Sequence, residues 1–135
     1  MTDRQRASLA AIVYTVRNRR FFSWHRIGVK RLPGGAHMYE FNGKIMPDSI
    51  DVNDDKYNKI MDRGYLSNPW GVKYDFIGKR GTDQIKLVLP EKSVNFYGYD
   101  GDFSRFEGTY YAPSDIVDIR DYSQDKDKYV YRIIW

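Results

Sequence analysis

The second half of the chain constrains the fold more than any other part of the sequence. Six short runs of alternating apolar and polar side chains lie there, and turn residues close each run. The runs cover residues 72–76, 85–89, 94–99, 103–111, 116–122 and 129–135. Alternation of this kind is typical of half-buried β-strands, and short connections make consecutive strands antiparallel neighbours. We therefore expect a meander that curls into a strongly bent sheet or a small barrel.

Two glycines lie inside these predicted strands. Gly98 and Gly108 each interrupt a run of large side chains. Glycine within a strand marks a bulge, a bend or the close approach of another backbone. We interpret both as corners at which the sheet bends.

The start of the chain predicts an amphipathic helix. Thr2 or Asp3 is a suitable N-cap, and the helix would end at about Asn18. One helical face would carry the apolar positions Leu9, Ile12, Val13 and Val16. We expect that face to pack on the sheet.

A hairpin and a second helix are predicted next. Asn42-Gly43 lies between alternating runs, which is the strongest short-range hairpin signal. Pro33-Gly34-Gly35 forms an earlier turn. Asn53 is a good helix cap, and Gly64 supplies a stop. The apolar face of this short helix would consist of Tyr57, Ile60 and Met61.

These elements predict an α+β fold in a single domain of residues 1–135. The order is an N-terminal amphipathic helix, a β-hairpin, a short second helix, and a curled antiparallel β-meander or small barrel. Residues 1–64 would form a helix-hairpin-helix half, and residues 71–135 the antiparallel β block. The chain has no cysteine and no apolar run near the roughly 20 residues that span a bilayer. We expect a cytoplasmic protein without a membrane partner.

Charge is distributed unevenly along the chain. Of the net charge of +4, residues 1–31 contribute +7, from eight basic side chains and one acid, so the remainder carries −3. Basic and aromatic residues alternate there, as on surfaces that hold single-stranded nucleic acid. Cations at the end of a helix and aromatic rings in a core explain the same residues without a ligand.

From this charge pattern we expect a non-catalytic binding protein, a regulator or inhibitor, with no cofactor. Its partner would be RNA, DNA or a nucleoprotein complex, contacted through the basic N-terminal third. The candidate contact residues are Arg17, Arg19, Arg20, Trp24, Arg26, Lys30 and Arg31.

Two alternatives remain open. The turn at residues 33–35 should pair the strands that carry His25 and His37, and with Glu40 these side chains would suit a small metal-independent ribonuclease. Two histidines lack the third donor that a metal site needs, so no metal is expected. The second alternative is a protein-interaction module that uses tyrosine-rich strands, since the chain has 12 tyrosines.

Overall fold

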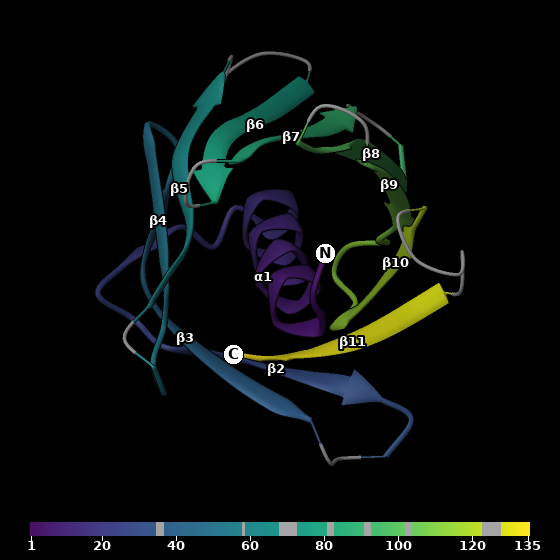
Figure 1. Ribbon diagram of the computed structural model, residues 1–135, viewed down its shortest axis with the longest axis horizontal. Coiled ribbons are helices and arrows are strands. Elements are labelled where there is room, and N and C mark those ends of the chain that lie inside the picture. The colour runs from purple at the N-terminus through teal and green to yellow at the C-terminus, as the bar shows by residue number, and fades with distance from the viewer. Residues whose placement is uncertain are drawn as a thin grey trace.

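In the computed structural model, an N-terminal helix lies inside a curled antiparallel sheet (Figure 1). The structure describes residues 1–34, 37–57, 59–67, 73–80, 83–90, 93–101, 104–122 and 128–135. Within these residues, no helix is long and apolar enough to cross a membrane. The fold is α+β, as predicted, with the helix preceding the meander.

The helix α1 spans Asp3–Asn18, as the sequence predicts. Thr2 is its N-cap. The Thr2 hydroxyl accepts a hydrogen bond from the backbone N–H of Gln5 at 3.1 Å, and the Gln5 side chain accepts one from the Thr2 N–H at 2.8 Å. This reciprocal pair is a capping box, which satisfies two of the backbone donors that a helix start leaves open.

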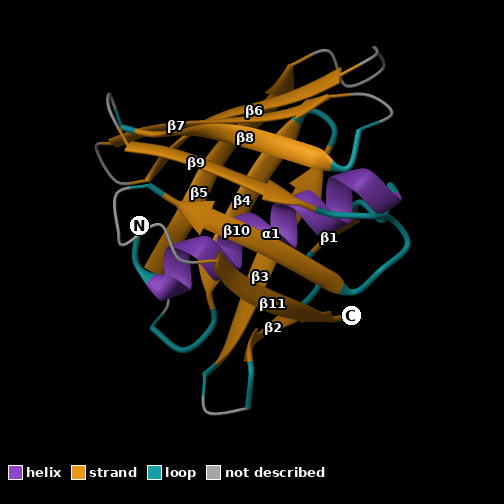
Figure 2. Ribbon diagram, turned by 90° about the vertical axis from the view of Figure 1, so that its right-hand side faces the viewer, coloured by secondary structure: helices purple, strands orange, loops and turns teal. Residues whose placement is uncertain are grey.

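The environment of α1 differs from the prediction, because the sheet surrounds the helix on all sides. Every residue from 6 to 16 is buried, where one buried face was expected. Figure 2 shows α1 crossing the inside of the sheet, with strands on either side of it. The small side chains of Ala7, Ser8, Ala10 and Ala11 are all fully buried and let strands approach the helix closely.

In the described part of the chain, eleven strands form the sheet, and each pairs antiparallel with its neighbours. The strands are β1 Phe22–Ser23, β2 Ile27–Leu32, β3 Met38–Met46, β4 Ser49–Asp54, β5 Lys59–Ser67, β6 Lys73–Arg80, β7 Asp83–Pro90, β8 Asn95–Asp100, β9 Ser104–Thr109, β10 Ile116–Asp121 and β11 Lys128–Ile134. The six runs predicted in the second half correspond to β6 through β11. Because β11 pairs with β2 and β3 pairs with both β2 and β4, the strands from β2 to β11 form a closed ring. Closure removes the unpaired edges that favour aggregation.

The predicted second helix over residues 53–64 is wrong, because this segment forms a strand hairpin. β4 ends at Asp54, and β5 begins at Lys59. The Asp54 carboxylate accepts a hydrogen bond from the backbone N–H of Lys56 at 3.1 Å, so the acid that resembled part of a helix start stabilises a turn instead. Asp side chains accept such backbone hydrogen bonds both at helix starts and in turns. The strand hairpin forms here because β4 pairs with β3 and β5, and β5 pairs with β4 and β6.

The predicted hairpin turn at Asn42-Gly43 is also wrong, since β3 runs through both residues. The chain reverses at Pro47 and Asp48 instead. Gly43 has a φ of +118°, and a Cβ there would lie 2.0 Å from the carbonyl oxygen of Asp51. Glycine is therefore required within the strand for conformation and for close approach of β4. The hairpin of this region joins β2 and β3, with Pro33-Gly34 at its start.

Gly98 and Gly108 allow phenylalanine rings to lie against the backbone of the facing strand. In the register of β8 and β9, Phe96 is opposite Gly108, and Gly98 is opposite Phe106. A Cβ at Gly98 would lie 2.5 Å from the Phe106 ring, and one at Gly108 would lie 2.4 Å from the Phe96 ring. The pairing continues past both glycines without a shift. Close approach, and not a bulge, is what these positions require.

Candidate functional site

The structure divides the predicted contact residues between the two ends of the ring. Arg19, Arg20 and Trp24 lie at or just beyond the C-terminal end of α1. Arg31 lies near the other end, where its guanidinium is 3.6 Å from the carboxylate of Asp3. Lys30, on β2, is half-buried. The predicted surface is therefore not one continuous patch.

A cluster of rings and cations forms at the C-terminal end of α1. We call Arg19, Arg20, Phe22, Trp24, His25 and Trp135 the basic-aromatic end. The Trp135 ring centroid lies 5.5 Å from that of Phe22 and 5.0 Å from that of His25. The Arg20 guanidinium lies 5.6 Å from the Trp135 ring centroid. Figure 2 shows the C-terminus on the same side as this end of α1.

Arg20 is fixed by aromatic neighbours. Its guanidinium donates a hydrogen bond to the Tyr14 hydroxyl at 2.9 Å and lies 5.9 Å from the centre of the same ring. No carboxylate of the described residues forms an ion pair with Arg20, and the residue is exposed. Its charge is thus held in place by Tyr14, and no carboxylate in the described part of the chain neutralises it.

Trp24 is held in solvent by an unusual backbone conformation. Its side chain is 88% exposed, and its φ is +61°. The Trp24 N–H donates to the carbonyl oxygen of Gly43 at 2.7 Å, which anchors the backbone. A positive φ costs a bulky residue about 1–2 kcal/mol, and such costs recur at functional sites. Core packing, the alternative explanation for this ring, does not apply.

Arg17 belongs to the fold and not to an open surface. Its guanidinium donates to the carbonyl oxygens of Pro90 at 2.8 Å and Asn95 at 3.2 Å, so it joins the end of α1 to β7 and β8. Burial lowers the pKa of Arg17. These hydrogen bonds leave little of the guanidinium for a phosphate group.

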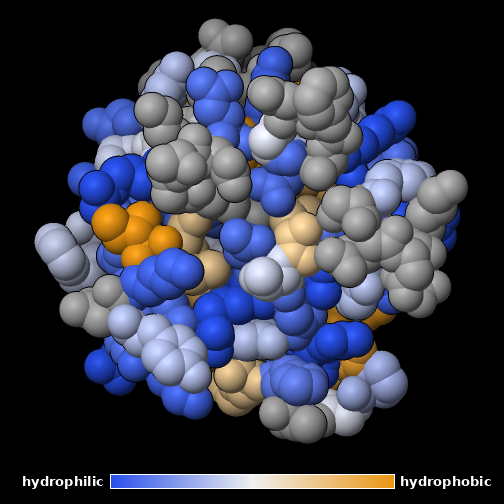
Figure 3. Space-filling view, viewed as in Figure 1, coloured by the Kyte–Doolittle hydropathy of each residue, from blue (hydrophilic) through white to orange (hydrophobic). Residues whose placement is uncertain are grey.

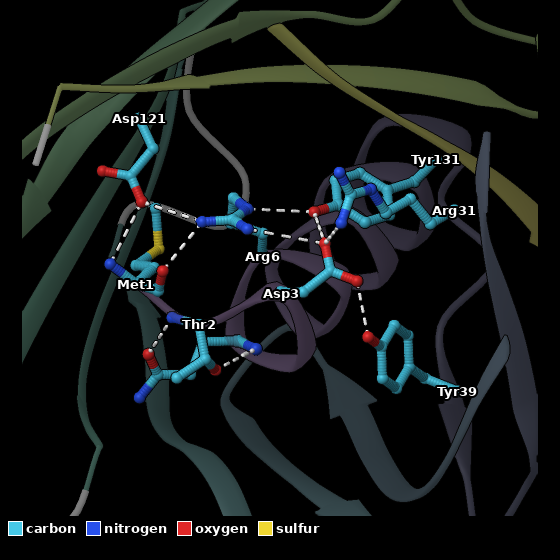
Figure 4. Close-up of polar contacts among 9 residues, drawn as sticks. Met1, Thr2, Asp3, Arg6, Arg31, Tyr39, Asp121 and Tyr131 are labelled. Atoms are coloured by element: carbon cyan, nitrogen blue, oxygen red, sulfur yellow. Dashed lines mark hydrogen bonds and ion pairs between the residues drawn. The ribbon is translucent and has the colours of Figure 1, made fainter. Parts of the chain in front are cut away.

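At the opposite end, Asp3 is the centre of a half-buried polar network (Figure 4). Its carboxylate accepts hydrogen bonds from the hydroxyls of Tyr131 at 2.7 Å and Tyr39 at 2.5 Å. Arg6 and Arg31 lie 3.5 and 3.6 Å away. Burial alone would raise the pKa of Asp3, but these hydrogen bonds and charges together lower it. Burial and the Asp3 carboxylate raise the pKa of Tyr39 to about 12.

Arg6 extends this network into the interior. It is 4% exposed, lies 3.3 Å from the carboxylate of Asp121, and has its guanidinium 3.7 Å from the ring centroid of Tyr129. Burial opposes its charge, but the hydrogen bond to Tyr131 and nearby negative groups raise its pKa. Arg6 is therefore a fully paired buried cation.

Ion pairs neutralise much of the positive charge in residues 1–31. Besides Arg6 and Arg31, Arg4 lies 3.0 Å from Asp54, and Arg26, which is 73% exposed, lies 3.7 Å from Asp55. Acids from the remainder of the chain and Asp3 supply the carboxylates. Among the cations of residues 1–31, the exposed Arg20, which forms no ion pair with a described carboxylate, lies at the basic-aromatic end.

The structure does not bring His25 and His37 together. His25 packs against Trp135 before β2 begins, whereas the His37 carbonyl accepts a hydrogen bond from the N–H of Arg31 near the end of β2. Six residues of strand separate these positions, which corresponds to about 20 Å. Glu40 is exposed on β3. A general acid and base that act on one substrate must lie far closer, so this pair has no shared site.

Trp135, like Phe22, belongs to the basic-aromatic end but is absent from the contact residues predicted from the sequence. It contacts Tyr14, Phe22 and His25, all from the first 25 residues. Only the pairing of β11 with β2 brings the two ends of the chain together. No local pattern marks such a contact.

The chain matches no protein-family model, and comparisons with curated proteins and with solved structures also found no significant match. Function must therefore be argued from the geometry of the site.

Proposed function

We propose that this protein is a non-catalytic binding protein, a regulator or inhibitor, that engages single-stranded nucleic acid through its basic-aromatic end. The observation that carries the proposal is Trp24, a large ring held 88% exposed by a backbone at φ +61°. An exposed ring offers a face on which a base stacks, and stacking of this kind contributes about 1–3 kcal/mol per base.

The same end of α1 supplies the second requirement, which is positive charge for the phosphates. Arg19 and Arg20 are both exposed, and the half-exposed ring of Trp135 adds a further stacking surface. With two or three phosphate contacts, the logarithm of the affinity should fall with the logarithm of salt concentration with a slope of about −1.5 to −2. We expect weak binding that tolerates different sequences.

Fluorescence anisotropy with labelled single-stranded RNA and DNA of about ten nucleotides tests the proposal at two salt concentrations. Arg20→Glu should weaken binding at least fivefold and reduce the salt dependence. Trp24→Gly should weaken it to a similar extent without strain, because glycine accepts a positive φ. The matched control is Arg120→Glu, an exposed arginine on β10 outside the cluster, which should bind like the unmodified protein.

Two results would reject the proposal. One is the absence of binding at low salt. The other is an equal loss of affinity in Arg20→Glu and Arg120→Glu, which would indicate a nonspecific response to net charge.

Exposed tyrosines support a second candidate function, which is protein binding. Tyr97 and Tyr99 are 40% and 45% exposed on β8, and Arg105 is paired opposite Tyr99 on β9. Tyrosine and arginine are enriched where proteins bind each other. A homodimer formed through this face should dissociate in Tyr99→Glu, as measured by light scattering. A monomer at all concentrations would reject the dimer.

A further inference from the structure

An open cleft lies at the N-terminal end of α1, at the opposite end of the ring from the basic-aromatic end. Its volume is about 760 Å³, within the usual range of small-molecule sites. The side chains that matter to its chemistry are Arg4, His37, Asp54, Lys56, Tyr57 and Lys59. Figure 3, which views this end of the molecule, shows a mainly hydrophilic face with separate apolar patches.

The cleft presents an excess of positive charge. Its two carboxylates, Asp3 and Asp54, are both occupied by arginines, Asp3 by Arg6 and Arg31 and Asp54 by Arg4. Lys56 and Lys59 are exposed, and no described carboxylate forms an ion pair with either ammonium group. An anionic group therefore finds two cations available there.

Beside these cations lies a partly apolar surface that suits a flat ring. Tyr57 is 58% exposed, and Met38 and Ile60 are 48% and 42% exposed. The Arg4 guanidinium lies 4.7 Å from the Tyr57 ring centroid and 5.1 Å from that of Tyr39, which restrains both rings. Exposed large apolar side chains that gather in a cleft between charges are typical of ligand sites.

Asp54 anchors Arg4 at the wall of the cleft. The residue is 2% exposed, its Oδ2 lies 3.0 Å from Arg4 Nε, and its Oδ1 accepts a hydrogen bond from the backbone N–H of Lys56 at 3.1 Å. This buried carboxylate is therefore part of the frame of the cleft, and the exposed side chains of Lys56, Tyr57 and Lys59 are the ones that a ligand can contact.

We propose that the cleft binds a free purine nucleoside phosphate. The phosphate contacts Lys56 and Lys59, and the base stacks on Tyr57. α1 has 16 residues and is about 24 Å long, so this site is distinct from the basic-aromatic end. The inference does not depend on nucleic-acid binding there.

Isothermal titration calorimetry with the full chain and with GMP, AMP, guanosine and inorganic phosphate tests the proposal. We expect a purine monophosphate to bind at least tenfold more tightly than guanosine or phosphate alone. Lys59→Glu should weaken nucleotide binding on the order of tenfold. Lys86→Glu, a matched charge reversal on the exposed face of β7, and Trp24→Gly should both leave it unchanged.

Several outcomes would overturn the inference. They are no nucleotide binding at millimolar concentration, equal affinity for guanosine or phosphate and the nucleotide, or equal effects of Lys59→Glu and Lys86→Glu. A 5′-phosphorylated dinucleotide that binds tenfold more tightly than the mononucleotide would assign the cleft to the end of a strand instead. Thermal unfolding of Lys59→Glu checks the fold, and an exposed lysine should leave the midpoint nearly unchanged.

Discussion

Replacing Asp3 by asparagine tests whether the polar network at the start of α1 stabilises the fold. The carboxylate is 17% exposed, accepts hydrogen bonds from Tyr39 and Tyr131, and lies near Arg6 and Arg31. Hydrogen bonds to a charged group contribute about 1.5–3 kcal/mol each. The asparagine side-chain oxygen can still accept one of the two tyrosine hydrogen bonds, and Arg6 keeps Asp121 as a partner. We therefore expect the free energy of unfolding to fall by about 2–3 kcal/mol at neutral pH, which is near the lower end of the cost of breaking a buried ion pair.

The effect of Asp3→Asn should depend on pH in a defined direction. The pKa of Asp3 is lower in the folded chain than its usual value of 3.8. Its stabilising contribution is therefore fully present above that value, and it is lost as the pH falls through the folded pKa. Asparagine does not titrate, so the difference in stability between the two proteins should shrink in acid.

Urea denaturation of both proteins at about pH 7 and about pH 3 measures this difference. Asp115→Asn is the matched control. The Asp115 side chain is 56% exposed and lies 3.5 Å from Arg132, and an exposed pair contributes less than about 1 kcal/mol. The reasoning is refuted if Asp3→Asn costs no more than the control, or if its cost is the same at both pH values.

Three further predictions concern a hydroxyl, two glycines and an arginine. The contribution of the Tyr39 hydroxyl is present below its usual pKa of 10.0 and is lost as the pH rises through about 12, so an ultraviolet titration should show a late tyrosine step that Tyr39→Phe removes. Gly98→Ala should prevent folding or cost several kcal/mol, because its Cβ would lie 1.9 Å from the Lys86 carbonyl oxygen. Gly101→Ala has no atom within 4 Å of its Cβ and a φ of +73°, so urea denaturation should show a cost of only about 1–2 kcal/mol. Arg17→Met leaves two backbone carbonyls without their donor and should cost about 1–3 kcal/mol, whereas the exposed Arg120→Met should cost almost nothing in the same assay.

The helix and the strands of the second half were predictable because a periodic pattern of apolar residues has a local physical cause. The cap at Thr2 and the periodic apolar residues predict α1, and alternation predicts β6 through β11. Residues 7–16 also contain no charged side chain, which is typical of a helix that is buried on all sides. The amphipathic interpretation used four apolar positions and overlooked this wider pattern.

Two local signals failed because they are compatible with more than one structure. The acids at Asp54 and Asp55 suit a helix start and equally a strand turn, in which Asp54 accepts from Lys56. Asn42-Gly43 suits a tight turn, but Gly43 serves a strand position where β4 approaches. In both cases the segment pairs with strands on both of its edges, which satisfies its backbone groups through the sheet.

The amino-acid sequence by itself determined the helix, its cap, the alternating strands and the concentration of positive charge in the first 31 residues. Only the tertiary structure decided which of those charges remain available. It paired Arg4, Arg6, Arg26 and Arg31 with carboxylates, tied Arg17 to backbone carbonyls, and placed His25 and His37 at opposite ends of β2. The physical reason is the separation along the chain. Periodic patterns involve residues a few positions apart, whereas these ion pairs and ring contacts join residues far apart in sequence and depend on which strands the closed sheet brings together.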